Sequence, residues 1–166
     1  MKIQIRKAVK KDFEEIDAIY SEGGIEEIKE RFPKRTYKSI YNEFKNKKSS
    51  RRKLFIKEIN AKNITFIVLQ VNDQIIGFGE GIVETSYGGR MGLIDKIYLN
   101  KTSRRKGFGA KLVKFLMKEM KNKKVDFFEW RVYSVNKGSL NLAGKFGFEV
   151  FSIRLRKNSK LTNQTH

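Results

Sequence analysis

The stretch Arg104-Arg105-Lys106-Gly107-Phe108-Gly109 stands between an apolar segment and a basic, amphipathic one. The segment before it, 91–99, is short, apolar and β-branched, which predicts a buried strand. The segment after it, 109–124, carries its apolar residues on one helical face. A strand, a glycine-bearing loop and a helix N-terminus turn backbone N–H groups toward an anion, and glycine lets a ligand approach the main chain closely. The stretch therefore predicts a phosphate or pyrophosphate site, although a tight turn without a ligand explains the same residues.

The loop departs from two common nucleotide-binding motifs, because it has neither the Gly-Lys-Ser/Thr of a P-loop nor the third glycine of a dinucleotide fingerprint. Arg104-x-x-Gly107-x-Gly109 instead resembles the Gln/Arg-x-x-Gly-x-Gly/Ala signature of the GNAT superfamily of N-acetyltransferases. A second stretch, Asn136 to Phe148, resembles the family's Asn-x-x-Ala/Ser-x-x-Phe/Leu-Tyr-x-x-x-Gly-Phe helix. The two motifs occur in the family's order, and the resemblance extends over roughly residues 2–157.

This resemblance implies a GNAT acyl-CoA N-acyltransferase fold, an α/β fold of the α+β type. Its sheet is expected to be mixed, mainly antiparallel and twisted, with a splayed central parallel pair and flanking helices. We expect one GNAT domain over 1–157 and a disordered polar tail over 158–166. Besides the strand and helix around the loop, the residue patterns predict strands at 2–9, 64–71, 75–84, 125–133 and 148–156. They predict helices from Asp12 as N-cap, over much of 21–63 with breaks at Gly23-Gly24 and Pro33, and over 137–146.

Composition excludes several classes of chemistry. The chain has no cysteine, and its one histidine is the terminal His166. Disulfides, thiol catalysis, thiolate zinc sites and histidine triads are therefore excluded, and no metal site is predicted. A general base must be a carboxylate, a lysine, a tyrosine or water. The sequence has no apolar stretch of about eighteen residues and no signal-peptide pattern, so we expect a cytoplasmic protein without a membrane segment.

The net charge of +19, from 37 Lys and Arg against 18 Asp and Glu, is high for a small enzyme. One interpretation is an acidic partner, such as nucleic acid or the ribosome. The other is a lysine-rich composition with solvated lysine faces. A basic surface would also help to capture the phosphates of coenzyme A.

Two charged clusters lie in the segment 21–63. The acidic cluster contains Glu22, Glu26, Glu27 and Glu30. The resemblance places the first helices on the acceptor side, so this cluster either receives a cationic amine or is a solvated helix face. The basic run 45–53 either contacts phosphate or is likewise solvated.

The resemblance implies that acetyl-CoA is the co-substrate. Its binding residues are expected to be Ile97, Tyr98, Leu99, Arg104, Arg105, Lys106, Gly107, Phe108, Gly109, Ala110, Asn136 and Ser139. The pantetheine arm is expected to pair with the backbone at Ile97 and Leu99, as an added strand would, and a backbone N–H near Ile97 or Tyr98 would face the oxyanion. Asn136 either holds the pantetheine, caps the following helix, or does both.

Asp95 is the candidate general base. On a regular strand, Leu93, Asp95, Ile97 and Leu99 would share a face, where a carboxylate is costly unless it is paired or used. The position resembles that of a catalytic glutamate in spermidine/spermine acetyltransferases. Because aspartate is shorter by one methylene, we expect it to act through a water. The alternative is an ion pair with a lysine or arginine at a strand bulge.

The candidate acid is less well defined. Ala143 occupies the position of the family tyrosine that protonates the departing thiolate, and alanine cannot donate a proton. Tyr133, or else Tyr98, is the candidate substitute, and the alternative is that both are ordinary strand aromatics.

These features predict an N-acetyltransferase that transfers acetyl from acetyl-CoA to a primary amine of a protein N-terminus, a lysine, a polyamine or another small molecule. One alternative is a non-catalytic acyl-CoA-binding module, to which Ala143 points. Another is a basic protein associated with nucleic acid or the ribosome. Neither the acceptor nor the oligomeric state follows from the sequence.

Overall fold

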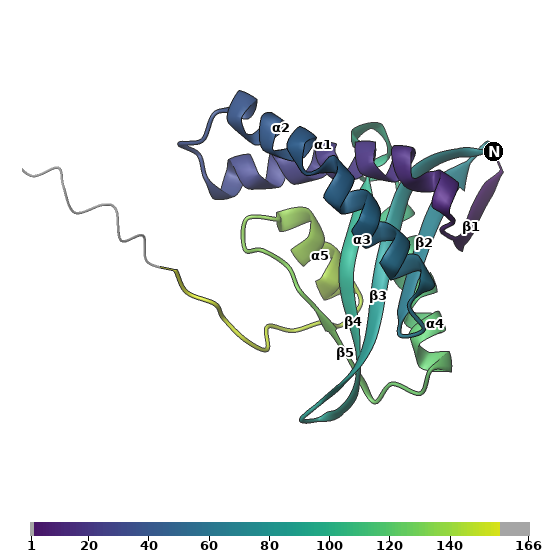
Figure 1. The fold of residues 1–166 in the computed structure, drawn as a ribbon. Coiled ribbons are helices and arrows are strands. Elements are labelled where there is room, and N and C mark those ends of the chain that lie inside the picture. Colours follow the sequence, from purple (N-terminus) through teal and green to yellow (C-terminus); the bar gives the residue numbers. More distant parts are fainter. Residues whose placement is uncertain (1, 157–166) are drawn as a thin grey trace, which may run out of the picture.

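The computed structural model describes residues 2–156 as a five-stranded sheet with helices on both faces (Figure 1). The strands, in spatial as well as chain order, are β1 (Ile3–Lys7), β2 (Ile64–Val71), β3 (Gln74–Ser86), β4 (Gly89–Leu99) and β5 (Phe127–Trp130). The helices are α1 (Phe13–Arg31), α2 (Tyr37–Asn46), α3 (Lys48–Asn60), α4 (Phe108–Asn122) and α5 (Lys137–Lys145), with 3₁₀ turns η1 (Lys10–Asp12) and η2 (Lys101–Ser103). The first four strands are antiparallel and β5 runs parallel to β4, so the expected mixed sheet is confirmed. None of these helices is long and apolar enough to cross a membrane.

The hairpin between β2 and β3 follows from local sequence. Asn72 and Asp73 have φ angles of 48° and 67°. Two successive positive φ angles give a two-residue turn whose twist matches the strands it joins, and Asn and Asp tolerate this conformation. The predicted turn is confirmed.

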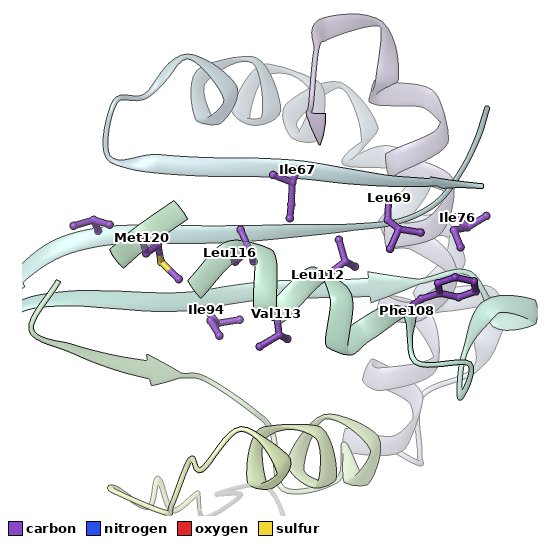
Figure 2. Packing of buried hydrophobic residues seen from close by; sticks show 10 residues of the cluster. Ile67, Leu69, Ile76, Ile94, Phe108, Leu112, Val113, Leu116 and Met120 are labelled. Carbon is purple, nitrogen blue, oxygen red and sulfur yellow. The ribbon is translucent and has the colours of Figure 1, made fainter. Parts of the chain in front are cut away.

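Helix α4 covers one face of the sheet. Its residues Leu112, Leu116 and Met120 are fully buried and point at β2, β3 and β4 (Figure 2). The glycines of β3 permit this close approach, since a Cβ at Gly79 would lie 3.0 Å from a methyl carbon of Leu116. Gly81 has the same role, since a Cβ there would lie 2.9 Å from the sulfur of Met120.

Helices α1 and α3 cover the other face, where Phe13 and Phe55 pack with Phe66 and Phe78 of the sheet. The expected break of α1 at Gly23-Gly24 is wrong, because α1 continues to Arg31. These glycines serve helix packing instead: a Cβ at Gly24 would lie 2.7 Å from the ring of Phe44 in α2. The break lies in the segment 32–36, which contains the predicted Pro33.

Asp12 precedes α1 as predicted, but its side chain does not cap that helix. Its carboxylate accepts hydrogen bonds from the backbone N–H of Val9, over 2.8 Å, and from the guanidinium of Arg6, over 2.7 Å. Asp12 is 3% exposed, so the pair ties the start of α1 to β1 through a nearly buried charge.

The C-terminal part differs from the prediction. The strand expected over 125–133 extends only over β5, and the segment 148–156 forms no strand. Four apolar side chains of this segment, Val150, Phe151, Ile153 and Leu155, are 78–90% exposed. Alternating hydrophobicity makes a strand only where a sheet edge receives it, and no segment within 2–156 pairs with the outer edge of β5. The predicted tail 158–166 lies outside the described residues.

Candidate active site

The loop that precedes α4 leaves the helix N-terminus open. Gly107 is the N-cap with a φ of 80°, and no side chain of the described residues caps the helix. Apart from its chain neighbours, a Cβ at Gly107 would meet no described atom within 4 Å, so this side of the loop is open. A left-handed glycine followed by a helical residue turns successive N–H groups outward at the positive end of the helix. This geometry fits a phosphate or pyrophosphate.

The strand that leads to this loop has a free edge. β5 pairs with β4 only over Met91–Ile94, whereas β3 continues beside β4 as far as Leu99. Among residues 2–156, the stretch 95–99 therefore pairs on one side only, as the expected splayed parallel pair requires. Such an edge offers backbone donors and acceptors to an extended ligand. The free edge and the open helix end are separated by only a few residues of chain.

A bulge in β4 places Asp95 outside the regular pairing. Lys96 lies opposite Glu80 and Ile94 lies opposite Gly81, so Asp95 has no partner on β3. The expected single face of Leu93, Asp95, Ile97 and Leu99 is therefore wrong. Ile94, Ile97 and Leu99 all pack in the α4 cluster, which a regular alternation would forbid. The half-buried Asp95 makes no ion pair with any described residue.

The family model of GNAT acetyltransferases matches residues 26–148, most of the chain. The chain belongs to the GNAT family. Similar solved structures include the PaiA N-acetyltransferase of Thermoplasma acidophilum with coenzyme A (22% identity, TM-score 0.75, covering 90% of this chain and 91% of that one). Others are a predicted acetyltransferase of Clostridium acetobutylicum with acetyl-CoA (21%, 0.60, 95% and 96%) and a transcriptional regulator of Bacillus halodurans (18%, 0.70, 95% and 99%). At these identities the structures show a shared fold. No curated protein matches the chain.

The first arginine of the GNAT signature fastens the loop to α1. Arg104 donates from Nη1 to Glu26 over 2.5 Å and from Nε to the carbonyl oxygen of Leu99 over 3.2 Å. The hydrogen bond from Arg104 lowers the pKa of Glu26. Glu22 accepts from the backbone N–H of Lys101 over 3.0 Å. Part of the acidic cluster is thus neither a solvated face nor an open amine site, because it anchors the loop. The other two cations of the loop are exposed.

Tyr98 lies in a row of aromatic rings on the α1 face. Its ring stacks on Phe78 with centroids 5.3 Å apart and meets Tyr20 edge-on at 5.2 Å. Burial, followed by the negative charges of Glu27 and Asp95, raises the pKa of Tyr98 well above its usual value. The phenol therefore keeps its proton throughout the physiological range, so it can donate a hydrogen bond but does not act as a base.

Tyr133 lies beyond the end of β5, in a loop. It is about half exposed, and the guanidinium of Arg31 lies 3.6 Å from its ring centroid. The prediction that it is a strand residue is wrong because β5 ends at Trp130. Its role as an acid stays a prediction.

The second GNAT motif forms α5 as expected. Asn136 is the N-cap, and its Oδ1 accepts from the backbone N–H of Ser139 over 3.0 Å. Ala143, at the position of the family tyrosine, is buried. The capping role of Asn136 is confirmed, and its expected contact with pantetheine, like that of Ser139, stays a prediction.

The sequence did not reveal a buried ionic cluster next to the bulge. Lys96 of β4 donates to Glu80 of β3 over 2.5 Å and to Glu58 of α3 over 2.9 Å. Glu80 is 1% exposed, and burial raises the pKa of its carboxyl to about 7. Burial alone would lower the pKa of Lys96, but Glu80 and then Glu58 reverse the direction and raise it. The one available signal was a glutamate between two glycines in the predicted strand 75–84.

The sequence indicated Glu27 of α1 only as a member of the acidic cluster. Burial raises the pKa of its carboxyl, and Arg31 partly opposes this at 3.5 Å. The negative charges of Glu27 and Asp95, which lie on different elements, both help to raise the pKa of Tyr98. Within residues 2–156, no group of three His, Cys, Asp or Glu side chains could hold a metal ion.

Proposed function

We propose that this GNAT protein transfers an acetyl group from acetyl-CoA to a primary amine. The observation that carries the proposal is the one-sided stretch 95–99 of β4 leading into the uncapped N-terminus of α4 at Gly107. An extended pantetheine arm fits a free strand edge, and a pyrophosphate fits an open helix end. Two similar structures, one with coenzyme A and one with acetyl-CoA, support the choice of donor.

The chemistry requires three events. The amine nitrogen attacks the thioester carbonyl carbon, the resulting oxyanion takes a hydrogen bond, and the C–S bond breaks to release coenzyme A as a thiolate. In this proposal the backbone N–H of Ile97 serves the oxyanion, because the N–H of Tyr98 faces β3. Asp95 takes the amine proton through a water, since the carboxylate has no ion-pair partner among the described residues and adjoins the free edge.

The coenzyme A thiolate leaves without a proton donor at position 143, where the family has a tyrosine. A thiol pKa of about 8.5 makes the thiolate a tolerable leaving group, so solvent protonates it, or Tyr133 does. Much of the remaining rate comes from holding the amine and the thioester together.

The test is thiol release from acetyl-CoA by pure protein, measured over a panel of primary amines that includes polyamines, amino sugars and peptides. Thiol release with at least one amine is expected, and Asp95→Asn should reduce it about 100-fold or more. Unchanged turnover in Asp95→Asn would remove Asp95 from the mechanism. Absence of acetyl-CoA binding in calorimetry would remove the proposed function altogether.

A second candidate is a module that binds an acyl-CoA without catalysis, which the buried Ala143 favours. It predicts acetyl-CoA binding by calorimetry and no thiol release with any amine of the panel. Ala143→Tyr separates the two candidates further, because a gain of turnover would show that only the proton donor was missing.

A further inference from the structure

The cluster of Glu80, Lys96 and Glu58, here called the ion triad, lies at the point where β4 changes register. Upstream of the bulge, Ile94 lies opposite Gly81, whereas downstream Lys96 lies opposite Glu80. The triad therefore joins the first residue of the shifted register to both β3 and α3. Its side chains are 1%, 22% and 13% exposed for Glu80, Lys96 and Glu58.

The alternative is a β4 without the bulge. If the upstream register continued, Asp95 would lie opposite Glu80 and Lys96 opposite Gly79. Two carboxylates would then face each other. The ammonium of Lys96 would turn to the α4 face, where the neighbours of Gly79 outside β4 are Leu116 and Ile67. A shift by one residue moves every following side chain to the other face, so Tyr98 would also leave its stacked position on Phe78.

Stability alone gives little reason to bury three charges here. Removing two ions from water is costly, and a well-packed apolar replacement of a buried ion pair is often equally stable or more stable. The best-attested use of such groups is to select one register among several. In this chain, the register selected is that of the free edge at 95–99.

We propose that the ion triad is a positioning device: by holding Lys96 opposite Glu80, it fixes the bulge at Asp95 and the placement of the backbone at Ile97–Leu99. Lys96, Glu80 and Glu58 act through Asp95 and the strand edge and touch no reacting atom. The expected effect on acetyl transfer rests on the function proposed above. The expected effect on the register of β4 does not depend on that function.

The decisive variant is the double substitution Glu80→Gln with Lys96→Met. Both side chains keep nearly their original length, and methionine is tolerated on either face of the sheet. The register without the bulge therefore no longer places a charge on the α4 face. Hydrogen exchange of those amides at 95–99 that face β3 should become about tenfold faster or more, while the midpoint of urea unfolding stays the same or rises. The value of kcat/KM for acetyl-CoA should fall about 10- to 100-fold.

Two controls make the result specific. Lys96→Arg keeps a cation opposite Glu80 and should retain both slow exchange and activity. Asp12→Asn with Arg6→Met removes another nearly buried ion pair, at β1 and η1, and should leave exchange at 95–99 and kcat/KM unchanged.

Exchange at 95–99 that stays slow in the Glu80→Gln/Lys96→Met variant would overturn the proposal, as would equal acceleration in the Asp12→Asn/Arg6→Met variant. If the double variant does not fold, Glu80→Gln alone gives the same comparison with a smaller expected change, because Lys96 keeps Glu58. Failure of the proposed function can be told apart from failure of this proposal. In the first case the wild-type protein would neither bind acetyl-CoA nor release thiol, and the exchange data would still decide the role of the ion triad.

Discussion

One carboxyl group in the sheet links the stability of the fold to pH. Burial raises the pKa of Glu80 to about 7 from its ordinary 4.5, with Lys96, Glu58 and Asp95 as the charged groups around it. Between these values, the folded protein keeps a proton that the unfolded chain has released. Its contribution to stability is therefore complete below pH 4.5 and is lost as the pH rises through 7.

We predict that the free energy of unfolding attributable to Glu80 falls by about 2.5 kcal/mol between pH 5 and 8. Urea unfolding at several pH values measures it, with Glu80→Gln as the comparison because glutamine does not titrate. The wild-type curve should decline relative to the variant. Parallel curves would show that Glu80 does not titrate in this range.

Alanine substitution at two glycines should change the free energy of unfolding in opposite directions. A Cβ at Gly77 would lie 2.4 Å from a methyl carbon of Leu99 and 2.7 Å from the carbonyl oxygen of Tyr98. The backbone of β4 would have to move, so Gly77→Ala should lower the free energy of unfolding by roughly 1–3 kcal/mol. At Gly144 in α5 a Cβ meets nothing within 4 Å, and Gly144→Ala should raise it by about 0.4–1 kcal/mol. Urea unfolding of both variants checks the signs, and a loss of stability in both would contradict the open surface at Gly144.

Residues whose conformation depends on near neighbours were the predictable ones. Asn72-Asp73 and Asn136 behave as expected because a tight turn and a helix cap involve atoms only a few residues away. The ion triad was missed because its members are 16 and 38 residues apart in sequence, and no local pattern brings them together. A bulge at Asp95 entered only as the alternative interpretation, because a bulge is a property of two strands and not of one.

At the scale of elements, the N-terminus of α4 offers a test of anion binding. Gly107→Ala and Gly107→Glu both place a side chain at a φ of 80°, so each should lose about 1–2 kcal/mol of stability. Only the glutamate adds a negative charge where the pyrophosphate is proposed to lie. By calorimetry, acetyl-CoA affinity should fall about tenfold more in Gly107→Glu than in Gly107→Ala. Equal affinities in the two variants would place the phosphates elsewhere.

Helical and strand periodicity predicted most elements, because each buries one stripe or face against the sheet or its covering helices. The prediction failed where a periodic segment lacks a neighbour. The segment 148–156 alternates apolar and polar residues as a strand would, yet it pairs with nothing among residues 2–156. The predicted break at the glycines of α1 was wrong for the converse reason. Close packing against Phe44 and Tyr98 outweighs the low helix propensity of glycine.

At the scale of the whole molecule, positive charge is distributed unevenly over the two faces of the sheet. The segment 12–60, with α1 to α3, contains twelve Lys and Arg and ten Asp and Glu, for a net charge of +2. Four cations of the basic run 45–53, Lys47, Lys48, Arg51 and Arg52, form ion pairs within it, which favours a structural role for that run. The segment 101–124 contains ten Lys and Arg against one Glu, for +9. Nearly half of the net charge of +19 therefore lies on α4 and its flanks.

This asymmetry predicts that α4 speeds the capture of acetyl-CoA from a distance. Lys114, Lys118 and Lys121 are exposed, form no ion pair within residues 2–156, and extend to about 20 Å from Gly107 at 1.5 Å per residue. The Debye length is about 30 Å at 0.01 M salt and about 8 Å at 0.15 M, so their field should reach the proposed site only at low salt.

Replacing these three lysines by glutamine should therefore lower the association rate constant several-fold at 0.01 M salt and leave it nearly unchanged at 0.15 M. The dissociation rate constant should not change at either salt concentration. The matched control replaces Lys38, Lys45 and Lys53 of α2 and α3, which are equally exposed and also form no ion pair among the described residues, and should have little effect. Stopped-flow binding of acetyl-CoA measures both constants. A changed dissociation rate would mean that α4 touches the ligand directly, and equal effects of the two triple variants would mean that net charge acts without regard to its position.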